Sequence, residues 1–276
     1  MEYRILGPLE VTHDGRPVAL GGAKQRALLA VLLLEAGRVV SPERLVDALW
    51  GDSPPEDARH AVQVYVSQLR KALAAGGPGS NPIVTQPGGY VLRLGPDDLD
   101  LHRFERDVEA GRSALSAGDA RTAVDLLRDA LRLFRGPPLA GLALEGPAGA
   151  AISRIEELRL TATEDRVRAE LQLGRHAELV PELQELVSAH PLREPLRASL
   201  MLALYRSGRQ ADALAVYQEG RAVLAEELGI DPMPELQALH GSILRQDPAL
   251  RGDAPPSEGI PPAGGAGPRS RAAHRP

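Results

Sequence analysis

Residues 58–73 constrain the fold of this chain more than any other stretch. Apolar side chains recur there at i, i+4, i+7 and i+11, which is one face of an α-helix; they are Val62, Val66, Leu69 and Leu73. The other side carries amides, a hydroxyl and cations: Arg59, Gln63, Ser67, Gln68, Arg70 and Lys71, with Tyr65 between the faces. Such a helix suits a DNA major groove, but ordinary surface helices share the pattern, so the flanking sequence must decide.

Two further helices are expected before this one. A stripe of leucines predicts a helix from Ala23 to Ala36, and Gly37 is a favoured residue to end it. Ser41 is a favoured N-cap for a second helix that runs to about Trp50, with proline at its first position.

Short strands are expected on both sides of these helices. Residues 1–20 alternate apolar and polar side chains, and Asp14-Gly15 is a hairpin turn signal. Three segments follow the helix of residues 58–73: a flexible turn over Gly76–Asn81 and two strands over 83–85 and 90–92. The order helix, helix, helix, β-hairpin predicts a winged helix-turn-helix.

The second half of the chain contains an internal repeat. The sequence Gly174–Glu178 recurs 34 residues later as Gly208–Asp212, and a looser copy begins at Gly118. A 34-residue period with glycine at the turn between two helices is the tetratricopeptide pattern. Glycine and proline over 136–149 interrupt the spacing, so we expect a divergent array of helix pairs.

These patterns predict a mainly α fold with a small β component. We expect a winged-helix domain over residues 1–95 and an all-α, tetratricopeptide-like domain over residues 100–246. Residues 247–276 are rich in proline, glycine and arginine and poor in apolar side chains, which predicts a disordered tail.

Composition excludes several classes of protein. The chain has no cysteine, which rules out disulfides, thiolate metal sites and a cysteine nucleophile. No apolar run approaches the roughly 20 residues of a membrane span, and the first residues lack a signal-peptide pattern. A soluble cytoplasmic protein without membrane contact is the expectation.

An enzyme finds little support in the sequence. The seven histidines are scattered, with no H-E-x-x-H pair for a metal. The chain has no G-x-x-x-x-G-K-[ST] phosphate loop and no G-x-S-x-G nucleophile sequence. We therefore expect a non-enzyme without cofactor or metal.

Charge placement distinguishes two kinds of binding protein. Residues 1–95 hold ten Lys and Arg against nine Asp and Glu, a net charge of +1, which slightly favours an adaptor whose winged helix contacts protein. From Ala58 to Leu94, however, there is no acidic residue. A helix and wing with cations alone favour DNA.

The order of blocks along the chain resembles the SARP family, the Streptomyces antibiotic regulatory proteins. The matching blocks are Tyr3–Leu9, Lys24–Ala30, Leu45–Trp50, Val62–Leu73, Gly88–Tyr90 and Leu99–Phe104. The N-terminal half is similar to OmpR-like winged helices, which act as effector domains in two-component systems. The helical half is similar to the bacterial transcriptional activation domain of the family, and together they cover about residues 1–245.

The resemblance implies a promoter-specific activator, typically of a gene cluster for a secondary metabolite such as an antibiotic. It implies side-by-side protomers, a homodimer on double-stranded promoter DNA, at direct repeats near the −35 element. It also implies contact with RNA polymerase and its sigma factor, and hence a nucleoid-associated location in the cytoplasm.

The resemblance also suggests roles for individual residues on the DNA-binding surface. Gln63, Ser67 and Gln68 are expected at base edges, and Arg59, Tyr65, Arg70 and Lys71 at phosphates. Many OmpR-like helices carry arginine where this chain has Ser67 and Gln68, so an adenine-containing half-site is favoured. The remaining candidates are Trp50, with its indole N–H on a phosphate or its ring in the core, and Thr85, Gln86 and Arg93 in the wing. Arg93 is expected either in the minor groove or solvated at the end of its strand.

Overall fold

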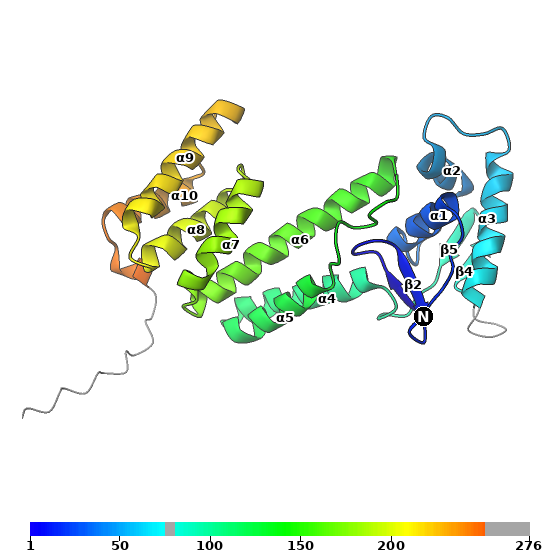
Figure 1. Ribbon diagram of the computed structural model, residues 1–276, viewed down its shortest axis with the longest axis horizontal. Coiled ribbons are helices and arrows are strands. Elements are labelled where there is room, and N and C mark those ends of the chain that lie inside the picture. The colour runs from blue at the N-terminus through cyan, green and yellow to red at the C-terminus, as the bar shows by residue number, and fades with distance from the viewer. Residues whose placement is uncertain (75–80, 252–276) are drawn as a thin grey trace, which may run out of the picture.

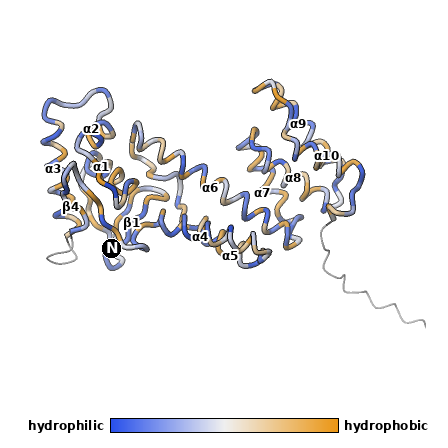
Figure 2. Tube along the Cα trace, turned by 180° about the vertical axis from the view of Figure 1, so that it is seen from behind, coloured by the Kyte–Doolittle hydropathy of each residue, from blue (hydrophilic) through white to orange (hydrophobic). Residues whose placement is uncertain are grey.

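The computed structural model describes residues 1–74 and 81–251. It confirms a mainly helical fold with a small β component at the N-terminal end (Figure 1). The elements lie in a row, with the strands and the first three helices at one end and the last four helices at the other. Along most helices hydrophobic and hydrophilic residues alternate, as expected for amphipathic helices that share a core (Figure 2).

The N-terminal sheet consists of β1 (Glu2–Arg4), β2 (Glu10–His13) and β3 (Arg16–Pro17), all antiparallel and in sequence order. Asp14 and Gly15 join β2 to β3 with φ angles of 50° and 76°. Two consecutive positive φ angles are those of a type I′ turn, the hairpin that this dipeptide predicts.

Three helices and a hairpin follow: α1 (Ala23–Leu34), α2 (Pro42–Trp50), α3 (Ala58–Leu73), β4 (Ile83–Gln86) and β5 (Gly89–Leu92). Ser41 caps α2, because its side chain accepts a hydrogen bond from the backbone N–H of Arg44. The first helix ends two residues earlier than predicted, since the chain already turns at Glu35 towards Gly37, whose φ is 79°. These elements confirm the winged helix-turn-helix.

The second half is helical throughout: α4 (Asp100–Ser116), α5 (Ala120–Arg132), α6 (Gly146–Gln172), α7 (His176–Ala189), α8 (Glu194–Arg206), α9 (Gln210–Leu228) and α10 (Pro234–Leu244). Each repeat glycine sits in a turn between two helices, with φ of 82° at Gly118 and 78° at both Gly174 and Gly208. The apolar residues that follow at equivalent positions, such as Leu179 and Ala213, are buried. The 34-residue period is therefore the period of the helix pairs.

The segment that interrupts the repeat spacing, between α5 and α6, connects the two halves of the molecule. This segment contacts the residues that follow β1: the backbone N–H of Arg135 donates to Leu6 O at 2.7 Å and that of Leu139 to Ile5 O at 2.9 Å. Asp100 is 1% exposed and accepts the N–H groups of Ile5 and Leu6 at 2.9 to 3.0 Å. Backbone groups of the N-terminal half are thus satisfied by the helical half.

The first hydrophobic core extends across the junction between the winged helix and the helical half. One core runs from Tyr3 through α1 to α4 and into α6 as far as Ala162, and a second begins at Val167 and extends to Ile243. The helix α6 contributes to both. The winged helix therefore shares one core with α4 and with the end of α5, while Ala120, Ala123 and Val124 of α5 pack with Ala169 of α6 in a separate small cluster.

The first residues of the predicted disordered tail are ordered, contrary to the prediction. Pro248–Arg251 form a 3₁₀ turn, η2, because Leu250 packs against the second core and its carbonyl accepts from Arg206 Nε at 2.8 Å. Residues 252–276 of that tail, and residues 76–80 of the predicted turn before β4 together with residue 75, lie outside the described residues. Within the described part, no helix combines the length and hydropathy needed to cross a membrane.

Candidate nucleic-acid interface

The helix α3 presents one side to the first core and the other to solvent. Val62, Val66, Leu69 and Leu73 are at most 2% exposed. The exposed side carries two stripes of residues spaced by four: Arg59, Gln63, Ser67 and Lys71, and next to them His60, Val64 and Gln68. In Figure 1 α3 lies at the end of the molecule farthest from α9 and α10, with β4 and β5 beside it.

Two of these exposed residues escaped the sequence-based selection. His60 and Val64 precede Gln68 by eight and four residues, so the same helical spacing places them on its stripe. Val64 is 36% exposed although it is apolar. An exposed methyl group beside amides is a partner for the methyl group of thymine.

The orientation of the Gln68 amide is set by Gln25 at the start of α1. The backbone N–H of Gly22 donates to Gln25 Oε1 at 2.6 Å, so the amino group of Gln25 is left to face α3. There Gln25 Nε2 donates to Gln68 Oε1. The oxygen of Gln68 is therefore turned to α1, and its amino group is turned away. Gln25 supplies only one half of a capping box, because Gly22 has no side chain to return a hydrogen bond. The sequence did not predict this cap or the contact of Gln25 with Gln68.

Arg59, at the first turn of α3, forms an ion pair with Glu43 of α2 at 2.6 Å. The two side chains are 74% and 54% exposed, so solvent screens the pair and a phosphate can replace the carboxylate. The pKa of Glu43 lies below its usual value, first because its own backbone N–H and the Ser41 hydroxyl hydrogen-bond the carboxylate, and then because of Arg59.

Arg70 braces the wing, a position different from the free phosphate contact expected from the sequence. Its Nε donates to Ile83 O at 3.0 Å and its Nη2 to Thr85 Oγ1 at 2.7 Å. The guanidinium carbon is also 6.0 Å from the centre of the Tyr90 ring. Arg70 and Thr85 thus join α3 to β4, while the neighbouring Lys71 is exposed.

The wing is a short antiparallel hairpin in which Gln86 pairs with Gly89 at the tip. Gly89 packs against the loop before α2: a Cβ at this position would stand 2.1 Å from Val40 O. Val40 and Tyr90 also exchange backbone hydrogen bonds at 2.8 and 2.9 Å, which fixes the wing to the helices.

Arg93 follows β5 at the base of the hairpin, where Ile83 pairs with Leu92, and not at the tip. It is exposed and borders a hollow that Met1, Tyr3 and Asp98 also line. The structure therefore separates Arg93 from Gln86, although the sequence placed both in the wing.

Trp50 and Tyr65 are half-buried and stack at the edge of the core, with ring centres 6.4 Å apart and planes 23° from parallel. Lys24 Nζ lies 5.4 Å from the centre of the Trp50 ring and donates to Leu49 O at the end of α2. Trp50 therefore both packs on the core and carries a cation, a lysine that the sequence-based selection left out.

Comparisons with known proteins agree with this architecture. The model of the bacterial transcriptional activator domain matches residues 99–244, and that of the C-terminal domain of transcriptional regulatory proteins matches residues 15–92. The regulatory protein DnrI of Streptomyces peucetius is 38% identical over 261 residues, which cover 92% of this chain and 96% of DnrI. The regulatory protein AfsR of Streptomyces coelicolor is 50% identical over 252 residues, which cover 91% of this chain.

Those 252 residues cover 25% of AfsR, so this chain spans about a quarter of the length of that relative. Among solved structures, Mycobacterium tuberculosis EmbR in complex with a low-affinity phosphopeptide superimposes with a TM-score of 0.86 at 39% sequence identity. The match covers 91% of this chain and 68% of the EmbR chain. These relatives are named as transcriptional regulators and not as enzymes.

Proposed function

Because the chain belongs to the SARP family of transcriptional regulators, we propose that it is a sequence-specific DNA-binding activator whose helix α3 enters the major groove. The observation that carries the proposal is the exposed side of α3. It combines amides, a hydroxyl and cations on a helix whose other side is locked into the core. No acidic residue occurs between Ala58 and Leu94, so helix and wing offer a phosphate backbone only attraction.

In this proposal Gln63, Ser67 and Gln68 read base edges, and Val64 contacts a thymine methyl group. Arg59 and Lys71 bind phosphates on either side, and Gln86 reaches the backbone from the tip of the wing. Arg70 and Thr85 hold the wing in place, as their hydrogen bond supports. Lys24 and Tyr65 bind phosphates near Trp50, whose indole N–H is a further donor at this edge.

The expected partners follow from family membership and from the connection between the halves. We propose that two copies bind side by side on direct repeats near the −35 element of promoters for a secondary-metabolite cluster. The helical half then contacts RNA polymerase and its sigma factor. The hydrogen bonds that Asp100 and Arg135 make with Ile5 and Leu6 support this arrangement, because a rigid junction places the helical half at a defined position on DNA.

Sequencing of genomic fragments that the purified chain captures at near-physiological salt tests the proposal. The control is a variant with Gln63→Ala, Gln68→Ala and Lys71→Ala, three exposed residues whose removal leaves the core intact. We expect the chain to enrich a few promoters that share a direct repeat, and the variant to lose this enrichment. Equal enrichment by both proteins would contradict the proposal and would favour an adaptor whose winged helix docks on protein.

A further inference from the structure

An apolar groove lies on the helical half, far from α3. It has a volume of about 480 Å³ and is walled by α6, α8 and the start of α10. Its floor is formed by Leu171, Leu202, Leu236 and Leu239, and Met233, which is 52% exposed, stands at its edge. The groove lies on the face of α6, α8 and α10, opposite to the hollow that α7 and α9 line.

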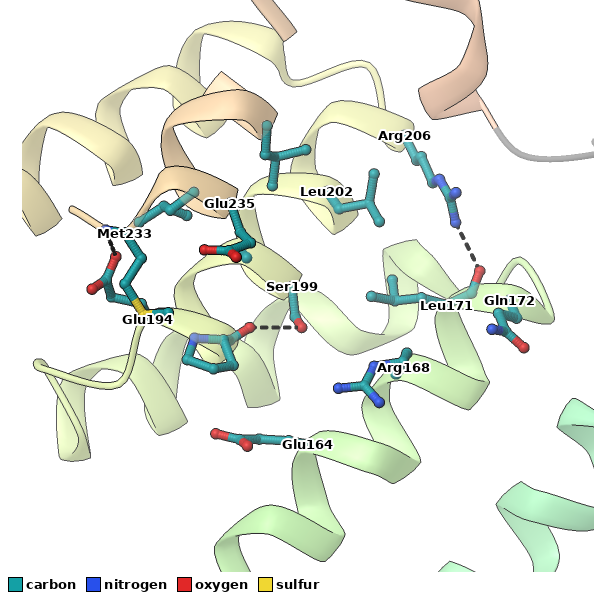
Figure 3. Close-up of a pocket in the computed structure, with 14 residues that line it drawn as sticks. Glu164, Arg168, Leu171, Gln172, Glu194, Ser199, Leu202, Arg206, Met233 and Glu235 are labelled. Carbon is teal, nitrogen blue, oxygen red and sulfur yellow. Dashed lines mark hydrogen bonds between the residues drawn. The ribbon is translucent and has the colours of Figure 1, made fainter. Parts of the chain in front are cut away.

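Charges of opposite sign mark the two ends of the groove (Figure 3). Arg206 and Arg168 lie at one end, beside Gln172, and Glu194 and Glu235 lie towards the other. Arg206 donates to two carbonyl oxygens, Leu250 O at 2.8 Å and Leu171 O at 2.9 Å. Among the described residues, Arg206 therefore bonds only to neutral carbonyl oxygens, and no carboxylate balances its positive charge.

The chain itself leaves the described fold at the arginine end of the groove. Leu250, the residue that Arg206 holds, is followed by the segment 252–276. Along this segment the order of side chains is acidic, apolar, basic: Asp253 and Glu258 come first, then Ile260-Pro-Pro262, then Arg269 and Arg271. Starting from the end where the chain leaves the described fold, the groove presents arginine, then an apolar floor, then glutamate. The order of charges along the segment is therefore complementary to the order along the groove.

The segment is also long enough to reach along the groove. The helix α8, which borders the groove from Glu194 to Arg206, rises about 18 Å over this distance. The nine residues that follow Arg251, up to Ile260, can reach up to about 30 Å when extended. Proline-rich segments lose little conformational entropy when they dock in an extended form.

We propose that residues 253–271 dock in this groove of the same chain, with Ile260-Pro-Pro262 on its apolar floor. The acidic residues of the segment meet Arg206 first and then Arg168, which also pairs with Asp165 at 3.2 Å, and the arginines of the segment meet Glu235. Because the segment is tethered next to the groove, even a weak intrinsic affinity gives substantial occupancy. Any partner that uses this face must then displace the segment first.

Disulfide trapping in the full chain tests the proposal, because the natural sequence has no cysteine. One variant carries Ser199→Cys in the groove and Ala263→Cys in the segment. Its matched control carries Ser188→Cys, on α7 in the opposite hollow, with the same Ala263→Cys. We expect intramolecular crosslinking to be at least about tenfold faster for the groove pair, because docking raises the effective concentration of the segment's cysteine at the groove.

A charge exchange separates docking from random collision. Glu235→Arg, at an exposed position, should slow the Ser199→Cys crosslink, and adding Arg269→Glu with Arg271→Glu should restore its rate. Equal crosslinking rates for the groove and control pairs would overturn the proposal. So would crosslinks that form only between two chains, since these would make a second copy the occupant.

Discussion

Gln25 at the start of α1 donates its side-chain amide hydrogen to Oε1 of Gln68 on α3, 43 residues away. Because the Gly22 N–H already occupies the side-chain oxygen of Gln25, Gln25 can only donate to Gln68 and cannot accept from it. It turns the amino group of Gln68 away from α1. The adenine preference expected from the sequence assumed an amide free to present both of its groups.

Gln25→Glu should change the base that Gln68 prefers. With an outward amino group Gln68 favours acceptor atoms, above all O6 and N7 of guanine. A glutamate at position 25 keeps the capping bond to Gly22, and its second oxygen then accepts from Gln68 Nε2. The Gln68 oxygen turns outward, and preference should shift towards the amino groups of adenine or cytosine by about 1–3 kcal/mol.

Selection from randomised DNA, followed by affinities for single-base variants, measures this shift. Gln25→Ala is the control: it should relax preference at the same base without reversing it. The added negative charge of the glutamate weakens all sequences alike, so relative affinities are compared. An unchanged ranking of bases at every position in Gln25→Glu would show that Gln25 does not orient Gln68.

Lys71→Ala should weaken binding to all DNA sequences to a similar extent. Lys71 is exposed at the end of α3 and carries a point charge suited to a phosphate. Its loss should make the decrease of the logarithm of the DNA-binding constant with the logarithm of salt concentration shallower, by about 1 in slope. Gln68→Ala, three residues earlier, should leave the salt slope unchanged and cost about 1–3 kcal/mol at one base. Titrations of specific and unrelated duplexes at several salt concentrations distinguish the two variants.

Asp100→Ala should destabilise the fold, because it leaves the N–H groups of Ile5 and Leu6 buried without acceptors. We expect a loss on the order of 3 kcal/mol in the free energy of unfolding. Asp97, three residues earlier, is exposed and pairs with Arg106 at 2.6 Å, so Asp97→Ala should change stability little. Urea unfolding of both variants tests this, and equal stabilities would refute the role of Asp100.

Short-range features of the fold were predictable. The ends of α2 and α3, the Asp14-Gly15 turn and the wing strands follow from caps, periodicity and turn residues within a few positions of each other. The repeat glycines likewise fall in the turns between helices. Each of these depends on local backbone preference, which a sequence states directly.

Contacts between distant residues were not predictable in the same way. Arg70 has the sequence pattern of a phosphate ligand, but its partners Ile83 and Thr85 are defined only once the wing folds back on α3. The change of pattern near residue 100 marks where strands end, not where a core ends, because buried Leu99 and Asp100 tie the two halves together. Periodicity shows which side of an element is buried, but not what lies against it.

Stability should fall as the pH drops below about 6.5, in part because of His240. Its ring stacks on Tyr217 with centres 3.9 Å apart, and burial lowers the pKa of His240 below its ordinary value of 6.5. Above that pH both folded and unfolded states are neutral at this group. As the pH falls through 6.5 the unfolded state binds the proton first, which destabilises the fold. His240→Phe keeps an aromatic ring without the titration, so its melting temperature should fall less between pH 7.5 and 5.5.

Gly220→Ala and Gly241→Ala should act in opposite directions, although both replace a glycine inside a helix. A Cβ on Gly220 would stand 2.2 Å from Cδ of Arg197, a buried side chain held by Val216 O and Pro191 O. Arg197 cannot move without losing these bonds, so a destabilisation of about 1–3 kcal/mol is expected.

At Gly241 the nearest atom is the end of the exposed Arg245 side chain at 3.1 Å, which can swing away. The gain in helix propensity, up to about 1 kcal/mol, then remains, and the variant should be more stable than the parent. Calorimetric melting of the two variants tests the pair. A stabilised Gly220→Ala would show that the approach of Arg197 to α9 is not what requires glycine there.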